Sequence, residues 1–526
     1  MTPAADGRDD GNSRHDRGGH HRKGPGSGRE TGETGGSQRD RRDSRGRQRN
    51  RPQSRTHTKN APSQRTRKAD PARLAAYEVL RAVAGEDAYA NLVLPGRIRN
   101  HHLDRRAAGF ATELAYGALR GQGTYDAILA RCVDRPLANL EPAIVDALRL
   151  GAHQLLAMRV PSHAALDQTV GLARAVIGAG PGSLVNAVLR RVAASDLPGW
   201  LDQLTSDVTD PVRELSLRHS HPEWVVRAFR QALAIHGRDT GEIEALLQAD
   251  NAAPVVNLVA LPGLGDLSEA FEAGATAGEL APGSALFASG DVGRLESVRT
   301  GTTRVQDAGS QLVARALAQA PGQSTAGPEA WLDLCAGPGG KAALLAALAA
   351  RSGATLLANE PAAHRATLVR QALAPVPPSV WRIREQDGRS AGEELSGSFD
   401  RVLVDVPCTG LGALRRRPEA RWRRQPADVA DLGPLQRELL QSALDAAKPG
   451  GLVAYVTCSP HPAETTVVVT DVLAKNQNAE LLDAPAALDA ASLSGGLQTG
   501  QASTAQLWPH IHSTDAMFMA LIRKNS

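Results

Sequence analysis

Two of the four cysteines in the chain follow apolar segments in the same way. Cys408 stands in "VLVDVPCTG" and Cys458 in "GLVAYVTCSP". Proline and small residues flank each cysteine, as in a sharp turn at the end of a strand. A single cysteine in such a place is usually a small packing residue. Two cysteines in equivalent places indicate instead that both thiols serve chemistry.

A pair of thiols suits covalent attack on a pyrimidine. Carbon 5 of the ring is a poor nucleophile, whereas addition of a thiolate to carbon 6 makes an enamine-like adduct whose carbon 5 can attack a sulfonium methyl group. Loss of the carbon 5 proton then expels the thiolate. Asp405 lies three residues before Cys408 and could bind the ring edge as electrons move into it. A base must be unstacked for this attack, so we expect a loop or a locally opened helix as substrate.

The elements that must position these thiols alternate between strand and helix from about residue 303. The expected strands lie in "AWLDLC", "ATLLANE", "FDRVLVDVPC" and "GGLVAYVTCS", with helix-forming segments between them. This alternation predicts an α/β domain with a doubly wound, mostly parallel sheet, in which ligands bind beyond the carboxyl ends of the strands. If the last two of these strands are neighbours, both cysteines face one cleft.

The segment "CAGPGGKA" predicts a turn that lets the backbone approach a ligand. Cys335 and Ala342 stand where a nucleoside triphosphate loop requires glycine and serine or threonine, so we expect no such site. Glu360 ends the following strand, where a carboxylate can accept both hydroxyls of a ribose. The pattern favours an adenosine cofactor and leaves a dinucleotide and S-adenosylmethionine open. We interpret Cys335 as a backbone contact rather than a nucleophile.

An arginine-rich segment, "LRRRPEARWRR", follows Cys408. Arginines can pair with phosphates and an indole can stack on a base, so the segment predicts contact with a polynucleotide. The alternative is a solvated charged loop anchored by Trp422. The arginines concerned are Arg415, Arg416, Arg417, Arg421, Arg423 and Arg424.

Composition sets the class of protein. The chain has 526 residues, a net charge of +4 and four cysteines that form no metal-ligand pattern. Residues 1–69 hold 18 Lys/Arg and 8 Asp/Glu and none of Val, Ile, Leu, Phe, Tyr or Trp, which predicts a disordered basic tail. No segment is apolar enough for a signal core or a membrane span. We expect a cytoplasmic monomer with no membrane and no metal partner.

Four regions follow from these patterns. After the tail, residues 70–203 read as helical, beginning at Asp70-Pro71, and the apolar stripe of Tyr125, Ile128, Leu129 and Cys132 places Cys132 in a core. Residues 204–302 form a connector with a small mixed α/β subdomain, in which "PVVNLVALPG" and "GSALFASGDVGRLESV" are expected as strands. Residues 303–526 form the catalytic domain.

At this point the motifs resemble a known family. "VQDAGSQLVA", "LDLCAGPGGK", "DVPCTG" with "LRRRPEARW", and "VTCS" with Pro462 and Glu464 are similar to the Sun/Fmu class of RNA cytosine-5 methyltransferases, over about residues 210–524. "DQTVGLAR" and "LVNAVLRRV" resemble the NusB-like RNA-binding domain of the bacterial members that act on small-subunit rRNA. The resemblance implies a Rossmann-like, S-adenosyl-L-methionine-dependent domain, 16S rRNA as partner, and cytosine-967-type specificity.

The resemblance also implies roles for single residues. Cys458 matches the nucleophile, Cys408 the cysteine that assists product release, and Asp405 lies between cofactor and base. Glu360 holds the ribose and Asp387 lies by the adenine. The loop that encloses the cofactor consists of Cys335, Ala336, Gly337, Pro338, Gly339, Gly340 and Lys341.

The sequence departs from the family pattern at a few positions. Ala342, Thr465-Thr466 and Ala516 replace residues that are usual in the family, which affects neighbouring packing more than the chemical groups. Three other functions are considered: methylation of tRNA, methylation of DNA with attack by Cys408, and a non-catalytic NusB-like assembly factor. The presence of Asp405 and both cysteines argues against the last.

Overall fold

The computed structural model describes residues 69–322, 327–500 and 502–525. The predicted basic tail therefore lies, except for Ala69, outside the described residues. In the described ranges no helix is long and apolar enough to cross a membrane. The same ranges hold no group of three or more His, Cys, Asp or Glu side chains arranged to bind a metal ion.

The first described region is helical. It begins where the Asp70 carboxylate accepts a hydrogen bond from the backbone N–H of Arg73, with Pro71 in the first turn, as the sequence predicts. Cys132 is 1% exposed and packs in the core of this region. The helices are α1 (Pro71–Gly85), α2 (Ala90–Asn100), α3 (Arg105–Arg120), α4 (Gln122–Cys132), α5 (Pro142–Leu156), α6 (Ser162–Val176), α7 (Ala179–Val192) and α8 (Leu197–Thr205).

Three helices and a small sheet follow. They are α9 (Pro211–His219), α10 (Glu223–Ile235) and α11 (Ile243–Asn251), and an antiparallel sheet in the order β2 (Thr276–Ala277), β3 (Ser284–Phe287), β1 (Val256–Ala260) and β4 (Thr303–Val305). Since β4 pairs with β1, this sheet extends past the expected boundary at residue 302.

One strand expectation in this region is only half right. "GSALFASGDVGRLESV" forms β3 in its first part, but its end enters helix α13 (Glu296–Thr300), and the short helix α12 (Ser268–Glu272) precedes it. The Glu269 carboxylate accepts hydrogen bonds from the backbone N–H groups of Glu296 and Ser297. This distant carboxylate satisfies the first free donors of α13 and so favours the helix there.

The large sheet has the order β10-β12-β9-β8-β5-β6-β7, with β11 paired to β12. The strands β5 to β9 are parallel, which confirms the predicted fold class, and β12 runs antiparallel to β9. β7 was not among the expected strands, because "WRIR" alternates with arginine and is short. The bounds are β5 (Ala330–Asp333), β6 (Thr355–Asn359), β7 (Trp381–Arg384), β8 (Phe399–Asp405), β9 (Ala447–Thr457), β10 (Ala479–Leu481), β11 (Ala505–Gln506) and β12 (Phe518–Lys524).

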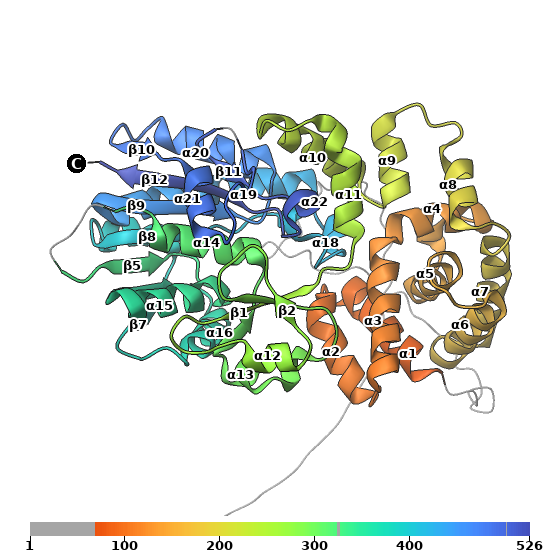
Figure 1. The fold of residues 1–526 in the computed structure, drawn as a ribbon. Coiled ribbons are helices and arrows are strands. Elements are labelled where there is room, and N and C mark those ends of the chain that lie inside the picture. Colours follow the sequence, from red (N-terminus) through yellow and green to blue (C-terminus); the bar gives the residue numbers. More distant parts are fainter. Residues whose placement is uncertain (1–68, 323–326, 501, 526) are drawn as a thin grey trace, which may run out of the picture. The chain divides into compact units, whose positions relative to one another are not determined.

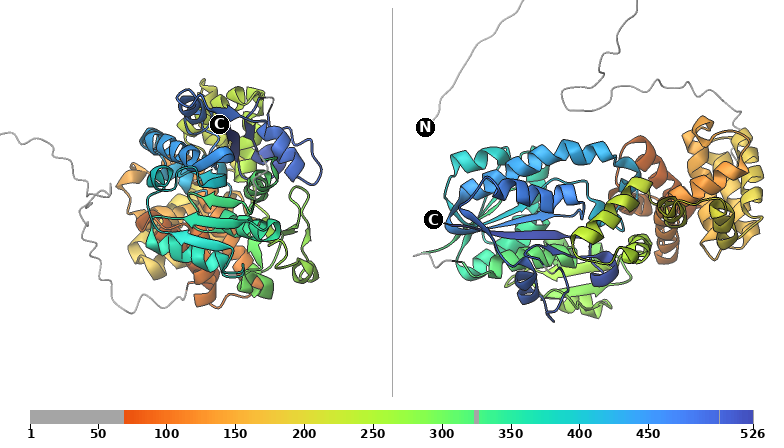
Figure 2. Two further views of the ribbon diagram at one scale, coloured as in Figure 1. Left: turned by 90° about the vertical axis from the view of Figure 1, so that its left-hand side faces the viewer. Right: turned by 90° about the horizontal axis from the view of Figure 1, so that it is seen from above.

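Helices cover both faces of this sheet (Figures 1 and 2). One apolar core joins the sheet to α14 (Ala308–Gln319), α15 (Gly340–Ser352), α16 (Ala363–Leu373) and α21 (Ala484–Ala491). The other core joins it to α17 (Ala391–Glu394), α19 (Pro426–Ala446) and α20 (Thr466–Leu473). The remaining short helices are α18 (Ala420–Arg423) and α22 (Pro509–His512). Burial on both faces holds the strand ends in fixed positions.

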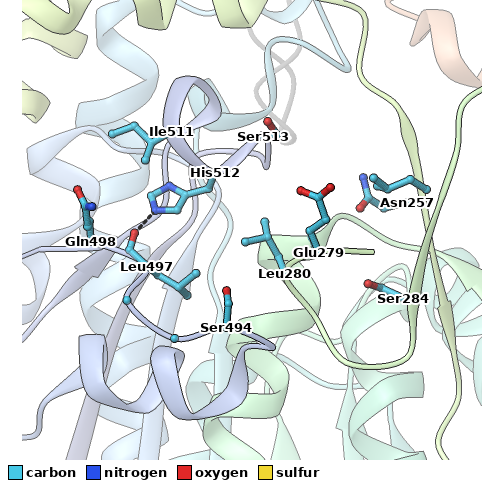
Figure 3. A pocket seen from close by; sticks show the side chains of 14 residues that line it. Asn257, Glu279, Leu280, Ser284, Ser494, Leu497, Gln498, Ile511, His512 and Ser513 are labelled. Atoms are coloured by element: carbon cyan, nitrogen blue, oxygen red, sulfur yellow. Dashed lines mark hydrogen bonds between the residues drawn. The ribbon is translucent and has the colours of Figure 1, made fainter. Parts of the chain in front are cut away.

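A cavity of about 310 Å³ lies beside the small sheet (Figure 3). Some of its polar side chains are bonded within the protein: His512 Nε2 lies 2.5 Å from the carbonyl oxygen of Leu497, and the Ser284 hydroxyl donates to the carbonyl of Ala281. None of the site residues predicted from the sequence lines it.

Candidate active site

The structure brings Cys408 and Cys458 together. Strands β8 and β9 are parallel neighbours, with Asp405 at the end of β8 opposite Val456 in β9. The loops that carry the cysteines therefore leave the sheet at the same edge. The two Sγ atoms lie 3.4 Å apart, within hydrogen-bond distance for sulfur. Two thiols this close can act on one ring.

The two thiols differ in acidity. The hydrogen bond from Cys408 lowers the pKa of Cys458, against the effect of burial, and the nearby Lys341 ammonium lowers it further. The same hydrogen bond, together with burial, raises the pKa of Cys408 well above its usual value. Cys458 is thus the thiol that ionises first, and Cys408 retains its proton. A thiolate is the nucleophilic form of cysteine, so this difference favours attack by Cys458.

Lys341 and Asp405 form an ion pair beside the thiols. Lys341 Nζ donates to Asp405 Oδ2 at 2.8 Å, across from the start of α15 to the end of β8. Burial lowers the pKa of Lys341, but Asp405, together with Cys458 and Asp333, raises it, and the net direction is upward. The ammonium therefore stays charged and stabilises a nearby thiolate. Asp405 remains partly exposed, with an oxygen available to a ligand.

The loop of residues 335–341 connects β5 to α15 and requires glycine at two places. Gly339 has φ 106°, and a Cβ there would lie 2.5 Å from Cβ of Ala372. A Cβ on Gly337 would lie 2.1 Å from Oε2 of Glu360. The missing side chains let the backbone pass close to a carboxylate that points at the loop. Burial raises the pKa of Cys335 well above its usual value, which suits a packing thiol.

Glu360 and Asp387 lie beyond the ends of neighbouring strands. Glu360 follows β6, is 2% exposed, and accepts a hydrogen bond from the backbone of Ala362. Arg365 lies 3.4 Å from Glu360 Oε2 and donates to the carbonyl of Gly337, which ties the acid to the glycine loop. Asp387 follows β7 and pairs with Arg389, which holds its pKa below the usual range.

Sequence reasoning missed Asp333. This residue is the last of β5 and is 1% exposed, and apart from the nearby backbone N–H of Cys335 its carboxyl oxygens have no hydrogen-bond partner in the described part of the chain. Burial, with the Asp405 carboxylate nearby, raises the pKa of Asp333 to about 7. The signal in the sequence was an acidic residue inside the apolar run "WLDL", where burying an unpaired carboxylate costs free energy.

These acids fit a cationic adenosine cofactor. Asp333, Glu360 and Asp405 are close enough for the other two to raise the pKa of Asp333. A sulfonium and an ammonium group would relieve this repulsion, whereas the phosphates of a dinucleotide would add to it. The carboxylate of Glu360 stands where a ribose can be held. The residues present therefore suit S-adenosyl-L-methionine.

A buried carboxylate braces the Cys408 loop. Glu464 accepts hydrogen bonds from the backbone N–H of Thr409 at 2.7 Å, from the Thr409 hydroxyl at 2.5 Å and from the side chain of Gln436 at 3.2 Å. Gln436 also donates to the carbonyl of Pro407. The turn around Cys408 is thus held from two sides. Glu464 was noted in the sequence as part of a motif, but this supporting role depends on contacts that the sequence does not show.

Much of the arginine-rich segment is engaged with protein rather than open to solvent. Arg415 and Arg416 both bond Asp307 and Asp515, and Arg415 is 6% exposed. Arg421 is fully buried and donates to the carbonyl of Ser220 and to Asn251. These guanidinium groups already have partners within the protein, so the predicted contact with phosphate stays a prediction for them.

Several residues of the segment keep some accessible surface, and of its arginines Arg417 is the one in the exposed class. Arg417 is exposed, with its guanidinium over the ring of Tyr89 at 4.9 Å. Trp422 is half-buried, and a Cβ on Gly123 would lie 2.4 Å from its ring, so the indole packs against α4. Trp422 therefore has mainly an anchoring contact, and Arg417 is the arginine of the predicted set best placed to meet RNA.

The fold and the site define an S-adenosyl-L-methionine-dependent methyltransferase. The family model of the 16S rRNA methyltransferase RsmB/F matches residues 323–523, and that of the NusB family matches residues 70–194. Together with the relatives described next, these matches show that the chain belongs to the RsmB/F family of 16S rRNA methyltransferases.

Two relatives and one solved structure are similar over most of their length. A Mycobacterium tuberculosis protein named as a methyltransferase is 47% identical, covering 87% of this chain and 97% of that protein. Ribosomal RNA small subunit methyltransferase B of Pseudomonas putida is 32% identical, covering 78% and 91%. The crystal structure of PH0851 matches with a TM-score of 0.71 and 22% identity, covering 87% and 99%, and shares the fold.

Proposed function

We propose that this rRNA methyltransferase acts on carbon 5 of a cytosine in 16S rRNA. The observation that carries the proposal is the 3.4 Å approach of Cys408 and Cys458, with the pKa of Cys458 lowered. A methyltransferase that modifies an exocyclic nitrogen or a ribose hydroxyl has no need of two thiols, whereas carbon 5 must be activated by addition at carbon 6.

Each residue then has a task. The Cys458 thiolate forms a bond to carbon 6, and Asp405 binds the ring edge that gains electron density. S-adenosyl-L-methionine supplies an electrophilic methyl group when bound, and carbon 5 takes it. After carbon 5 loses its proton, the bond between Cys458 and carbon 6 breaks and the electron pair returns to sulfur. Cys408, which keeps its proton beside Cys458, assists this release.

Other residues are proposed to hold the cofactor. Glu360 accepts the ribose hydroxyls, Asp387 lies by the adenine, and the acidic group of Asp333 and Asp405 faces the positive charges of the cofactor. The glycine loop of residues 335–341 encloses it. For the RNA, the supporting names are those of the relatives, of which one is a ribosomal RNA small subunit methyltransferase B. Cytosine-967-type specificity is part of the proposal.

Bisulfite mapping of 16S rRNA tests the function directly. RNA from cells that contain the protein should retain one cytosine that cells lacking it convert. Expression of the wild-type chain should restore protection, and Cys458→Ala should not. If cells lacking the protein kept every protected cytosine of 16S rRNA, the proposal would be rejected.

Transfer of labelled methyl groups in vitro separates the alternatives. Free 16S rRNA, assembled small subunits, tRNA and DNA are offered in parallel to the purified protein. Label in 5-methylcytosine of 16S rRNA supports the proposal. Label in tRNA or DNA alone would assign a different substrate, and no label in any would favour a non-catalytic assembly factor.

A further inference from the structure

A second cavity, of about 220 Å³, lies far along the chain from the cysteines. Helices α3, α4, α5 and α9 contribute to its lining, together with Ser220 and Asn251. Among its side chains, Arg120, His153, Arg218 and His219 carry nitrogen donors. No residue of the proposed catalytic or cofactor site lines it.

Arg120 lines this cavity without a partner. Its side chain is 9% exposed, yet in the described ranges it takes part in no hydrogen bond and no ion pair, and its Nε atom is wholly buried. Its guanidinium lies 5.3 Å from the centre of the Tyr116 ring, and the Glu113 carboxylate is near enough to act on it electrostatically without forming an ion pair. Burial lowers its pKa, although an arginine stays protonated. A buried guanidinium with unused donors is costly unless an acceptor reaches it.

Two further donors face the same space. His153 is 3% exposed, with Nδ1 at 2.8 Å from the Tyr125 hydroxyl and Nε2 without a hydrogen bond in the described part. Helix α4, of 11 residues, begins at the cavity: Gly121 is its N-cap, with no capping side chain, and Gly121 and Thr124 line the wall. The partial positive charge of a helix N-terminus attracts an anion.

The cavity also contains one carboxylate. Glu113 lies 3.6 Å from His153 Nε2 with its side chain 55% exposed, and that contact, opposed by burial, holds its pKa below the usual value. Arg218 is already paired with Glu214 at 2.8 Å, and His219 lies 3.3 Å from Glu244. Among the arginines of the lining, Arg120 is therefore the one without a hydrogen-bonded partner in the described ranges, and its donors are free for an anion.

The cavity is joined to the segment that follows Cys408. Gly123, in the first turn of α4, donates its N–H to the Ser220 hydroxyl at 2.9 Å and packs against Trp422. Arg421, next to Trp422, donates to the carbonyl of Ser220. An anion held at the start of α4 thus lies against the base of the loop that carries Cys408.

We propose that this cavity binds a phosphodiester group of the RNA substrate, with Arg120 and the N-terminus of α4 as its donors. A phosphodiester has a single negative charge and acceptor oxygens that match a guanidinium. The inference rests on the proposed function in taking the substrate RNA as the ligand.

Three variants test the site through affinity for a 16S rRNA fragment. Arg120→Gln should weaken binding roughly tenfold, as expected for loss of a charged hydrogen bond, and lower the salt slope by about 1. Glu113→Gln should strengthen binding, because it removes the competing carboxylate. Arg213→Gln removes an equal charge from an exposed position of α9 outside the cavity and should have a smaller effect than Arg120→Gln.

The outcomes separate the possible ligands. If inorganic phosphate protects the protein against thermal unfolding through Arg120 but RNA affinity does not depend on Arg120, the cavity serves a small anion and the proposal is overturned. If Arg120→Gln and Arg213→Gln weakened RNA binding equally, the effect would come from net charge rather than from the cavity, and the proposal would also be overturned. If Arg120→Gln fails to fold, Glu113→Gln and the charge-retaining Arg120→Lys are measured instead. The proposal requires that Glu113→Gln binds RNA more tightly than the wild type.

The same experiment distinguishes this site from the proposed chemistry. Arg120→Gln should raise KM for RNA while kcat at saturating RNA stays unchanged, because Arg120 touches no reacting atom. RNA binding that depends on Arg120 without any methyl transfer by the wild type would sustain the site and reject the proposed function. Methyl transfer by the wild type, with the same KM for RNA in Arg120→Gln, would sustain the proposed function and reject the site.

Discussion

The backbone N–H of Gly412 donates to the carbonyl oxygen of Cys458 at 2.8 Å. This bond ties the loop that carries Cys408 to the residue that bears the other thiol. Gly412 is required there, because a Cβ would lie 2.1 Å from the carbonyl oxygen of Ala516. The distance between the two sulfurs is therefore fixed by backbone contacts at the end of the sheet as well as by the strands themselves.

Replacing the two cysteines separately should give opposite results. Cys458→Ala should abolish methyl transfer and form no adduct, because the attacking sulfur is gone. Cys408→Ala should still allow attack but slow release, so that a protein-RNA adduct survives denaturation. Gel shift under denaturing conditions with labelled RNA measures both. An adduct with Cys458→Ala, and none with Cys408→Ala, would reverse the assigned roles.

The pH dependence should report the environment of Cys458. The reactive form is the thiolate, so kcat/KM for RNA should rise with pH through the lowered pKa of Cys458 and then level off. Lys341→Met removes the ammonium that favours the thiolate, which should move this rise to higher pH. The profile is measured at saturating cofactor. An unchanged rise in Lys341→Met would show that another group controls it.

Much of this arrangement could be predicted from the sequence. Strand-like runs that end in Cys408 and Cys458 implied a shared cleft, since parallel strands end at one edge. Asp70 and Pro71 marked the first helix because capping is local chemistry. The fates of Arg415 and Arg421 could not be predicted, because their acceptors, Asp307 and the carbonyl of Ser220, are more than a hundred residues away in the chain.

Asp333 should destabilise the cofactor-free protein at neutral and alkaline pH. Its folded-state pKa, about 7, lies above the ordinary value of 3.8, so the native state binds the extra proton and stability falls as pH rises from about 4 to 7. Asp333→Asn removes the buried charge and should raise stability at pH 8 by up to roughly 4 kcal/mol, and much less at pH 4. Urea unfolding at both values measures this.

Asp400→Asn is the matched control for that experiment. Asp400 is also buried in the sheet region, but it accepts from the backbone of Ala330 at 2.7 Å and pairs with Lys448 at 2.8 Å. The substitution Asp400→Asn should therefore destabilise the protein at pH 8, because it weakens these bonds. If both variants were destabilised alike, the unpartnered state of Asp333 would not be the cause.

Glu464 should matter for the Cys408 loop more than for the sheet. Glu464→Gln places an amide N–H₂ against the donors of Thr409 and Gln436, which should cost about 2 kcal/mol of stability and loosen the turn. We expect slower product release, seen as a longer-lived protein-RNA adduct. Glu438→Gln, at an exposed ion pair with Arg389, should change neither quantity appreciably.

Arg421 and Arg417 should separate structure from RNA contact. Arg421→Gln removes a fully buried guanidinium that holds Ser220 and Asn251, so it should lower the unfolding temperature, whereas RNA affinity of the folded fraction should change little. Arg417→Gln acts on an exposed side chain, so it should leave stability nearly unchanged and weaken RNA binding with a salt slope smaller by about 1. Calorimetry and RNA titration at several salt concentrations measure both variants. If well-folded Arg421→Gln lost RNA affinity and Arg417→Gln did not, Arg421 rather than Arg417 would be the residue that contacts RNA.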